Sequence, residues 1–71
     1  MAQNRKLLID RDFQEAMEHH IPLRVFKDDQ IVDSGGIIIR FDDQIVVAQS
    51  GVSELAYHSR TECEFFEMRK R

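Results

Sequence analysis

Two pairs of neighbouring acids are the first candidates for a functional site in this chain. The run Asp-Asp-Gln-Ile-Val occurs twice, starting at Asp28 and, fourteen positions later, at Asp42. Four carboxylates brought together could bind a divalent cation. Each pair, however, precedes a β-branched run, and acids in that position are typical of turns, where they bond nearby backbone N–H groups. Turns joined by a single strand lie at its opposite ends, so the repeat predicts two structural turns rather than a metal site.

The remaining reactive side chains show no catalytic arrangement. His19 and His20 are adjacent, so on a helix they point about 100° apart and chelate a metal poorly together. Cys63 is the only cysteine, which excludes an intrachain disulfide and a zinc site built on cysteines. The sequence contains neither a glycine-lysine phosphate loop nor a serine nucleophile elbow. We therefore expect a protein that is not an enzyme, with no catalytic residues, no metal and no cofactor.

Size and charge limit the class of protein. A chain of 71 residues is expected to form one domain over 1–71, and its small core favours self-association as a further source of stability. The net charge of −3 argues against general nucleic-acid binding, although residues 69–71 form a short basic tail. No apolar run reaches the ~20 residues of a membrane span, and the first ten residues do not resemble a signal peptide. The expected location is the cytoplasm, away from membranes.

One helix is expected near the start of the chain. Apolar residues at helical spacing predict a helix over about 10–20. Pro22 disfavours helical geometry at the residue before it, so the helix should end near His20. Asp12 followed by Glu15 is similar to a capping box, in which Asp12 accepts hydrogen bonds from early backbone N–H groups.

Five strands are expected between residues 21 and 68. Apolar runs separated by turn formers, with clear alternation in 21–26 and 53–59, predict them over 21–26, 30–41, 45–49, 53–59 and 63–68. Gly35 and Gly36 indicate a sharp bend in the longest strand, with a flexible linker as the alternative. The last strand carries apolar or aromatic groups on both faces, so we expect the helix or a neighbouring subunit to cover it. The expected fold class is α+β, mainly β: an N-terminal helix, then a strongly bent five-stranded antiparallel sheet that forms a small barrel.

Three segments resemble the Sm-like family of small β-barrels, and its Hfq-like bacterial branch in particular. IPLRVF is similar to the valine-proline strand that follows the helix in this family. SGGIIIRFDDQIVVAQS is similar to the family's Gly-Phe-Asp-Asn segment. ELAYHS is similar to its Leu-Ile-Tyr-Lys-His segment. Arg40 and Asp43 stand where the family has a glycine and an asparagine. Ser59 stands where the family has a uridine-binding histidine, and His58 comes one position earlier.

This resemblance implies a homo-oligomeric ring in which neighbouring Sm-like barrels pair strands edge to edge. It also implies binding of single-stranded RNA in or around the pore, with bases stacked on aromatic side chains. The residues expected to contact RNA are Arg40, Phe41, Tyr57, His58 and Arg60. Phe66 and Met68 are expected at the interface between subunits. The alternative function is a non-enzymatic protein-interaction module on the same barrel, without nucleic-acid binding.

Overall fold

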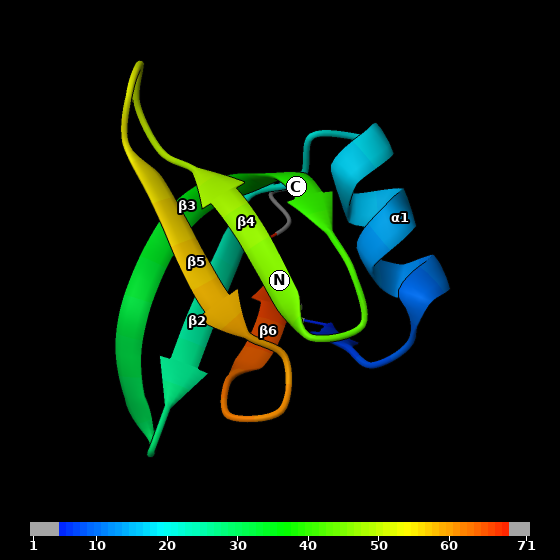
Figure 1. Cartoon of the computed structure of the whole chain (residues 1–71), viewed down its shortest axis with the longest axis vertical. Helices are drawn as coiled ribbons and strands as arrows, with labels where there is room; N and C mark the ends of the chain where they lie inside the picture. The colour runs from blue at the N-terminus through cyan, green and yellow to red at the C-terminus, as the bar shows by residue number, and fades with distance from the viewer. Residues whose placement is uncertain (1–4, 69–71) are drawn as a thin grey trace.

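The computed structural model describes residues 5–68, which form one helix and six strands (Figure 1). In chain order the elements are β1 (Lys6–Leu7), α1 (Asp10–Glu18), β2 (Leu23–Lys27), β3 (Gln30–Phe41), β4 (Ile45–Gln49), β5 (Leu55–Ser59) and β6 (Glu64–Glu67). The strands form a single antiparallel sheet in the order β1-β6-β2-β3-β4-β5. The mainly β class, the helix and the five expected strands are therefore confirmed, while the predicted basic tail at 69–71 lies outside the described residues.

The sheet is open, so the expectation of a closed five-stranded barrel is wrong in both closure and strand number. β1 and β5 are its two edges, and within residues 5–68 they do not pair with each other. The additional strand is β1, which pairs Lys6 with Phe66 and Leu7 with Phe65. Two residues are too few to show an alternating pattern, so only their pairing with a distant strand defines this element.

β3 is the strand that curls the sheet. Its first part pairs with β2 as far as Gly36, and from Ile37 onwards it pairs with β4. Gly35 has φ +90°, a left-handed backbone conformation that favours glycine. A Cβ added at Gly36 would lie 3.1 Å from the Cβ of Ala48, so only a residue without a side chain fits there unless its neighbour moves. The two glycines thus produce the predicted bend inside one continuous strand, and they are not a linker.

The two copies of Asp-Asp-Gln-Ile-Val form the turns at the two ends of β3, as expected, but in different ways. In the first copy Asp28 and Asp29 both have positive φ, +53° and +64°, as in a two-residue hairpin turn. In the second copy Asp42 Oδ1 accepts the N–H groups of Gln44 and Ile45 at 2.8 and 2.9 Å, and these bonds lower the pKa of Asp42. Among residues 5–68, no group of three His, Cys, Asp or Glu side chains is arranged to hold a metal ion.

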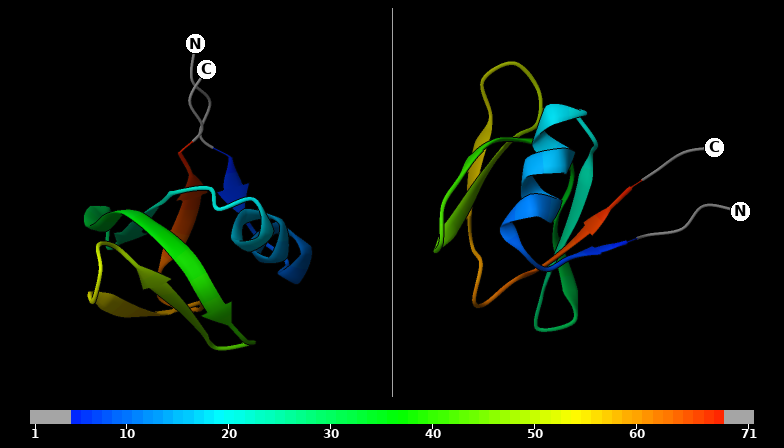
Figure 2. Two further views of the ribbon diagram at one scale, coloured as in Figure 1. Left: turned by 90° about the horizontal axis from the view of Figure 1, so that it is seen from above. Right: turned by 90° about the vertical axis from the view of Figure 1, so that its right-hand side faces the viewer.

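Helix α1 covers the opening between the two halves of the curved sheet, as the right-hand view of Figure 2 shows. Phe13 and Ala16 are its buried core residues. The ring of Phe13 packs against Phe41 of β3 and Phe65 of β6, with centroid distances of 5.8 and 5.4 Å. Burial of one such ring contributes roughly 1.5–3 kcal/mol, so this aromatic cluster is a main link between helix and sheet.

Asp12 fixes the start of α1 by accepting early backbone N–H groups, as expected, but it does so from the last position of a capping box rather than from the first. Ile9 is the N-cap, and Asp12 lies three residues later in the first turn. Its Oδ2 accepts hydrogen bonds from the backbone N–H groups of Leu8 and Ile9 at 2.8 and 3.2 Å. Its Oδ1 accepts a hydrogen bond from the guanidinium of Arg5. The bond from Leu8 contributes most to lowering the pKa of Asp12, the bond from Ile9 and the Arg5 charge add to it, and burial opposes it.

Candidate binding surface

One row of cross-strand neighbours lies on the outer face of the sheet. Arg40 in β3 pairs with Val47 in β4, which pairs with Tyr57 in β5. Arg40 is exposed and Tyr57 is 61% exposed, whereas Val47 between them is buried without belonging to the main core. Two strand spacings separate Arg40 from Tyr57, about 10 Å between backbones. The structure therefore brings these two predicted RNA contacts to one surface.

Two other predicted RNA contacts, Phe41 and His58, point to the opposite, inner face, because successive side chains in a strand alternate. Phe41 packs against the core. His58 Nε2 lies 3.0 Å from Asp33 Oδ2, and the imidazole packs at 6.2 Å against the ring of Phe65. The side chains of His58 and Asp33 are only 10% and 16% exposed. Neither predicted contact is on the surface that carries Tyr57.

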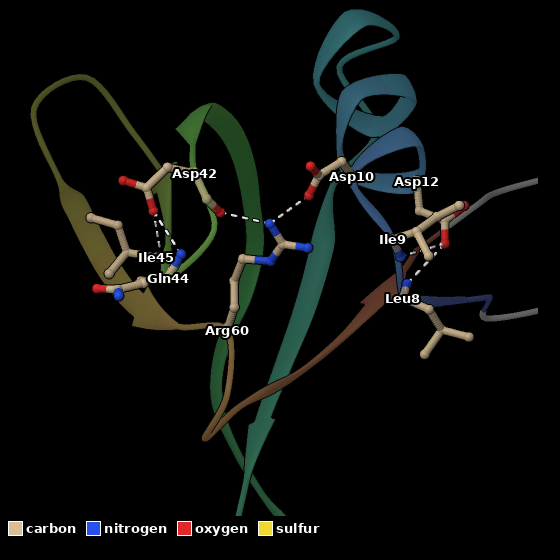
Figure 3. A network of polar contacts seen from close by, with 8 residues as sticks. All are labelled: Leu8, Ile9, Asp10, Asp12, Asp42, Gln44, Ile45 and Arg60. Atoms are coloured by element: carbon tan, nitrogen blue, oxygen red, sulfur yellow. Dashed lines mark hydrogen bonds and ion pairs between the residues drawn. The ribbon is translucent and has the colours of Figure 1, made fainter.

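Arg60 holds three parts of the fold together (Figure 3). Its Nη1 donates to Asp10 Oδ1 at the start of α1, at 2.7 Å, and to the backbone oxygen of Asp42, at 2.6 Å. Its guanidinium carbon lies 4.4 Å from the centroid of the Phe13 ring. The Arg60 side chain is 13% exposed, so this cation is largely occupied inside the fold rather than presented to a phosphate.

The predicted interface residues Phe66 and Met68 are half-buried and have partners within the chain. The Phe66 ring packs edge to face against Phe26, with centroids 5.4 Å apart. The hydroxyl of Ser34 donates to the sulfur of Met68 at 3.7 Å. The edge of β6 next to Phe66 is occupied because Lys6 of β1 pairs there. In this conformation β6 does not offer the free edge that ring formation through the last strand requires.

Sequence reasoning missed an apolar surface around Tyr57. Ile39 and Leu55 are 46% and 48% exposed, and Leu55 shares the outer face of β5 with Tyr57 because they are two positions apart. We call Ile39, Leu55 and Tyr57 the outer apolar face. A shallow groove lined by Ile37 and Ile39, among others, continues it towards the end of α1. The signal that could have revealed it was the alternation in LAYHS, where the large apolar groups fall on one side.

Comparisons with protein-family models, curated proteins and solved structures found no match to this chain. The similarity to the Sm-like family therefore rests on the sequence motifs alone. Within residues 5–68, no helix is long and apolar enough to cross a membrane.

We expect His58→Ala to lower the free energy of unfolding by about 2 kcal/mol, because it leaves the largely buried carboxylate of Asp33 without its imidazole partner. Urea unfolding followed by circular dichroism measures this change. Tyr57→Ala is the matched control, since it lies next to His58 in the same strand with its side chain exposed, and its effect should stay within about 0.5 kcal/mol. Equal effects of the two substitutions would show that the contact between His58 and Asp33 does not stabilise the fold.

Proposed function

We propose that this chain is a non-enzymatic protein-interaction module that binds its partner through the outer apolar face. The observation that carries this proposal is the exposure of Ile39 in β3 and of Leu55 and Tyr57 in β5, at 46%, 48% and 61%, on two strands of one sheet that are separated by β4. Contiguous exposed apolar groups are uncommon on monomeric proteins and are typical of interaction sites. Tyrosine also combines a large contact area with few rotatable bonds, which makes it a frequent anchor of protein interfaces.

The charge of the chain supports a protein ligand over RNA. Nucleic-acid affinity depends largely on several cations that neutralise phosphates. On the described surface around Tyr57, Arg40 is the cation available, because Arg60 is paired with Asp10. The net charge of −3 adds general repulsion from a polyanion.

The test is a pull-down with the immobilised chain after nuclease treatment. We expect wild type to retain a stoichiometric protein, and Tyr57→Asp to weaken its binding at least about tenfold, because a carboxylate at the centre of an apolar interface is poorly solvated. Val52→Asp is the matched control: Val52 is 95% exposed in the turn between β4 and β5, and the same charge change there should leave binding intact. Retention of a partner by Tyr57→Asp at wild-type strength would exclude this face as the binding site.

Binding of single-stranded RNA is the second candidate function, and the shared row of Arg40 and Tyr57 is the observation that favours it. A base stacked on Tyr57 would have a phosphate within reach of Arg40. In the same experiment without nuclease, this function would appear as retained RNA that is lost in Tyr57→Asp. The Sm-like homo-oligomer with RNA in a pore belongs to this candidate.

A further inference from the structure

β5 is an edge strand, and its only neighbour among the described strands is β4 (Figure 1). Two backbone hydrogen bonds at the ends of the β4–β5 ladder show how the backbone of β5 is oriented. The N–H of Arg60 donates to the backbone oxygen of Gln44 at 2.8 Å, and the N–H of Ser50 donates to the backbone oxygen of Glu54 at 3.0 Å. Hydrogen-bonded pairs occur at every second residue of an antiparallel ladder. The residues between Glu54 and Arg60 that bond to β4 are therefore Ala56 and His58.

The backbone groups of the alternate residues, Leu55, Tyr57 and Ser59, are directed away from β4. Within residues 5–68 the Leu55 and Tyr57 groups have no strand beside them, while the oxygen of Ser59 accepts the N–H of Cys63 at 3.0 Å. An unpaired row of this kind is a template for another strand unless charges, proline or a bulge protect it. The sequence of β5, LAYHS, has no Asp, Glu, Lys, Arg or Pro, and its pairing with β4 shows no bulge. The other edge strand, β1, differs from β5 in this respect, because it carries the charged residue Lys6.

We propose that β5 pairs antiparallel with β5 of a second copy of this chain, giving a two-fold symmetric dimer centred on Tyr57. In this register Tyr57 lies opposite Tyr57 of the second copy, and Leu55 lies opposite Ser59. It is the register that pairs the whole of Leu55–Ser59, and it joins residues whose backbone groups are both directed outwards.

Electrostatics are compatible with this self-pairing. The same register sets Glu54, at one end of β5, opposite Arg60 at the other end in the second copy, so unlike charges face each other. Because Arg60 is already paired with Asp10, the main effect is that no like charges meet, which matters for a chain with a net charge of −3. The two tyrosine rings would also form a cross-strand aromatic pair on the outer face.

A head-to-tail ring is disfavoured by the same structure. Such a ring would need the edge of β6 to receive β5 of a neighbour, and β1 occupies that edge along Phe65 and Phe66. Symmetric pairing of β5 with itself displaces no described strand and closes after two copies. It also brings the two outer apolar faces together into one surface. The dimer is inferred from the edge of β5, so it does not depend on the proposed binding of another protein.

The decisive experiment combines sedimentation equilibrium with amide hydrogen exchange followed by NMR, from about 10 µM to about 1 mM, where a weak dimer dissociates. We expect a monomer–dimer equilibrium in which the amides of Leu55 and Tyr57 become protected as concentration rises. The amides of Ala56 and His58 should be protected at every concentration, because they bond to β4. A monomer throughout, or a dimer whose Leu55 and Tyr57 amides stay unprotected, would overturn the proposal.

A charge variant gives an independent test. Tyr57→Lys would set two like charges opposite each other at the two-fold axis, and we expect it to raise the dimer dissociation constant at least about tenfold. Val52→Lys adds the same charge in the neighbouring turn and should leave the constant unchanged. Circular dichroism establishes that both variants are folded. An equal dissociation constant in the two variants would contradict pairing through β5, whatever the pull-down with other proteins shows.

Discussion

Replacing Arg60 with alanine is expected to lower the free energy of unfolding by about 3 kcal/mol. The guanidinium donates to Asp10 and to the backbone oxygen of Asp42, and it stacks at 4.4 Å on Phe13. The pair with Asp10 contributes least, because the Asp10 side chain is 69% exposed and water screens the attraction. Most of the loss comes from the buried ring of Phe13, which is no longer covered by the guanidinium, because the hydrogen bond to the oxygen of Asp42 is also exposed and water can replace it.

Two further substitutions separate charge from geometry at this position. Arg60→Lys keeps the charge but loses the planar group that reaches two oxygens and stacks on a ring, so about half of the loss should remain. Arg40→Ala is the matched control, because the Arg40 side chain is exposed and makes no hydrogen bond or ion pair within residues 5–68. Its effect should stay within about 0.5 kcal/mol. Urea unfolding gives all three values, and an Arg60→Ala protein as stable as Arg40→Ala would show that Arg60 does not anchor the helix.

Asp12→Asn is expected to lower the free energy of unfolding by about 2 kcal/mol at neutral pH. Three donors converge on this carboxylate, from the backbone of Leu8 and Ile9 and from the guanidinium of Arg5. An amide offers one acceptor oxygen without a negative charge, and its NH₂ group would face a donor. The substitution therefore weakens both the first turn of α1 and its connection to β1.

The pH dependence of stability tests the same site. The folded pKa of Asp12 lies below its ordinary value of 3.8, so its stabilising contribution is complete above that pH and is lost as pH falls through the folded pKa. Stability of wild type should thus decrease more steeply with acid than that of Asp12→Asn, and the two should converge once Asp12 is protonated. Asp43→Asn, a neutralisation at an exposed turn position, should follow wild type. Parallel curves for wild type and Asp12→Asn would contradict this role.

Local sequence determined the elements of the sheet more closely than its closure. The strands predicted over 30–41 and 45–49 coincide with β3 and β4, because turn-forming residues lie on both sides of each run. β1 was missed because it exists only through its pairing with β6, at the other end of the sequence. Whether the sheet closes depends on where its edges lie in space, which no alternating pattern encodes.

The candidate site was predicted only in part for a similar reason. Tyr57 and His58 were both expected to contact RNA, but they lie on different faces, because a strand directs adjacent side chains to opposite sides. The position of Arg60 could not be predicted in this way, since its partners Asp10 and Asp42 are 50 and 18 residues away in the sequence. An arginine near the end of a strand looks available to phosphate until those partners are known. Ion pairs between distant residues therefore decide which cations are free.

The position of β6 between β1 and β2 has a consequence for how the protein matures on the ribosome. β6 is the last strand of the described chain, and it completes the hydrogen bonding of both of these earlier strands. Until residues 64–67 have emerged from the exit tunnel, β1 has no neighbour, β2 has one open side and the core lacks Phe65. Pairing across such long sequence separations is intrinsically slow. Folding of this domain therefore cannot be completed before residues 64–67 are available, and until then the chain exposes unpaired strands to chaperones.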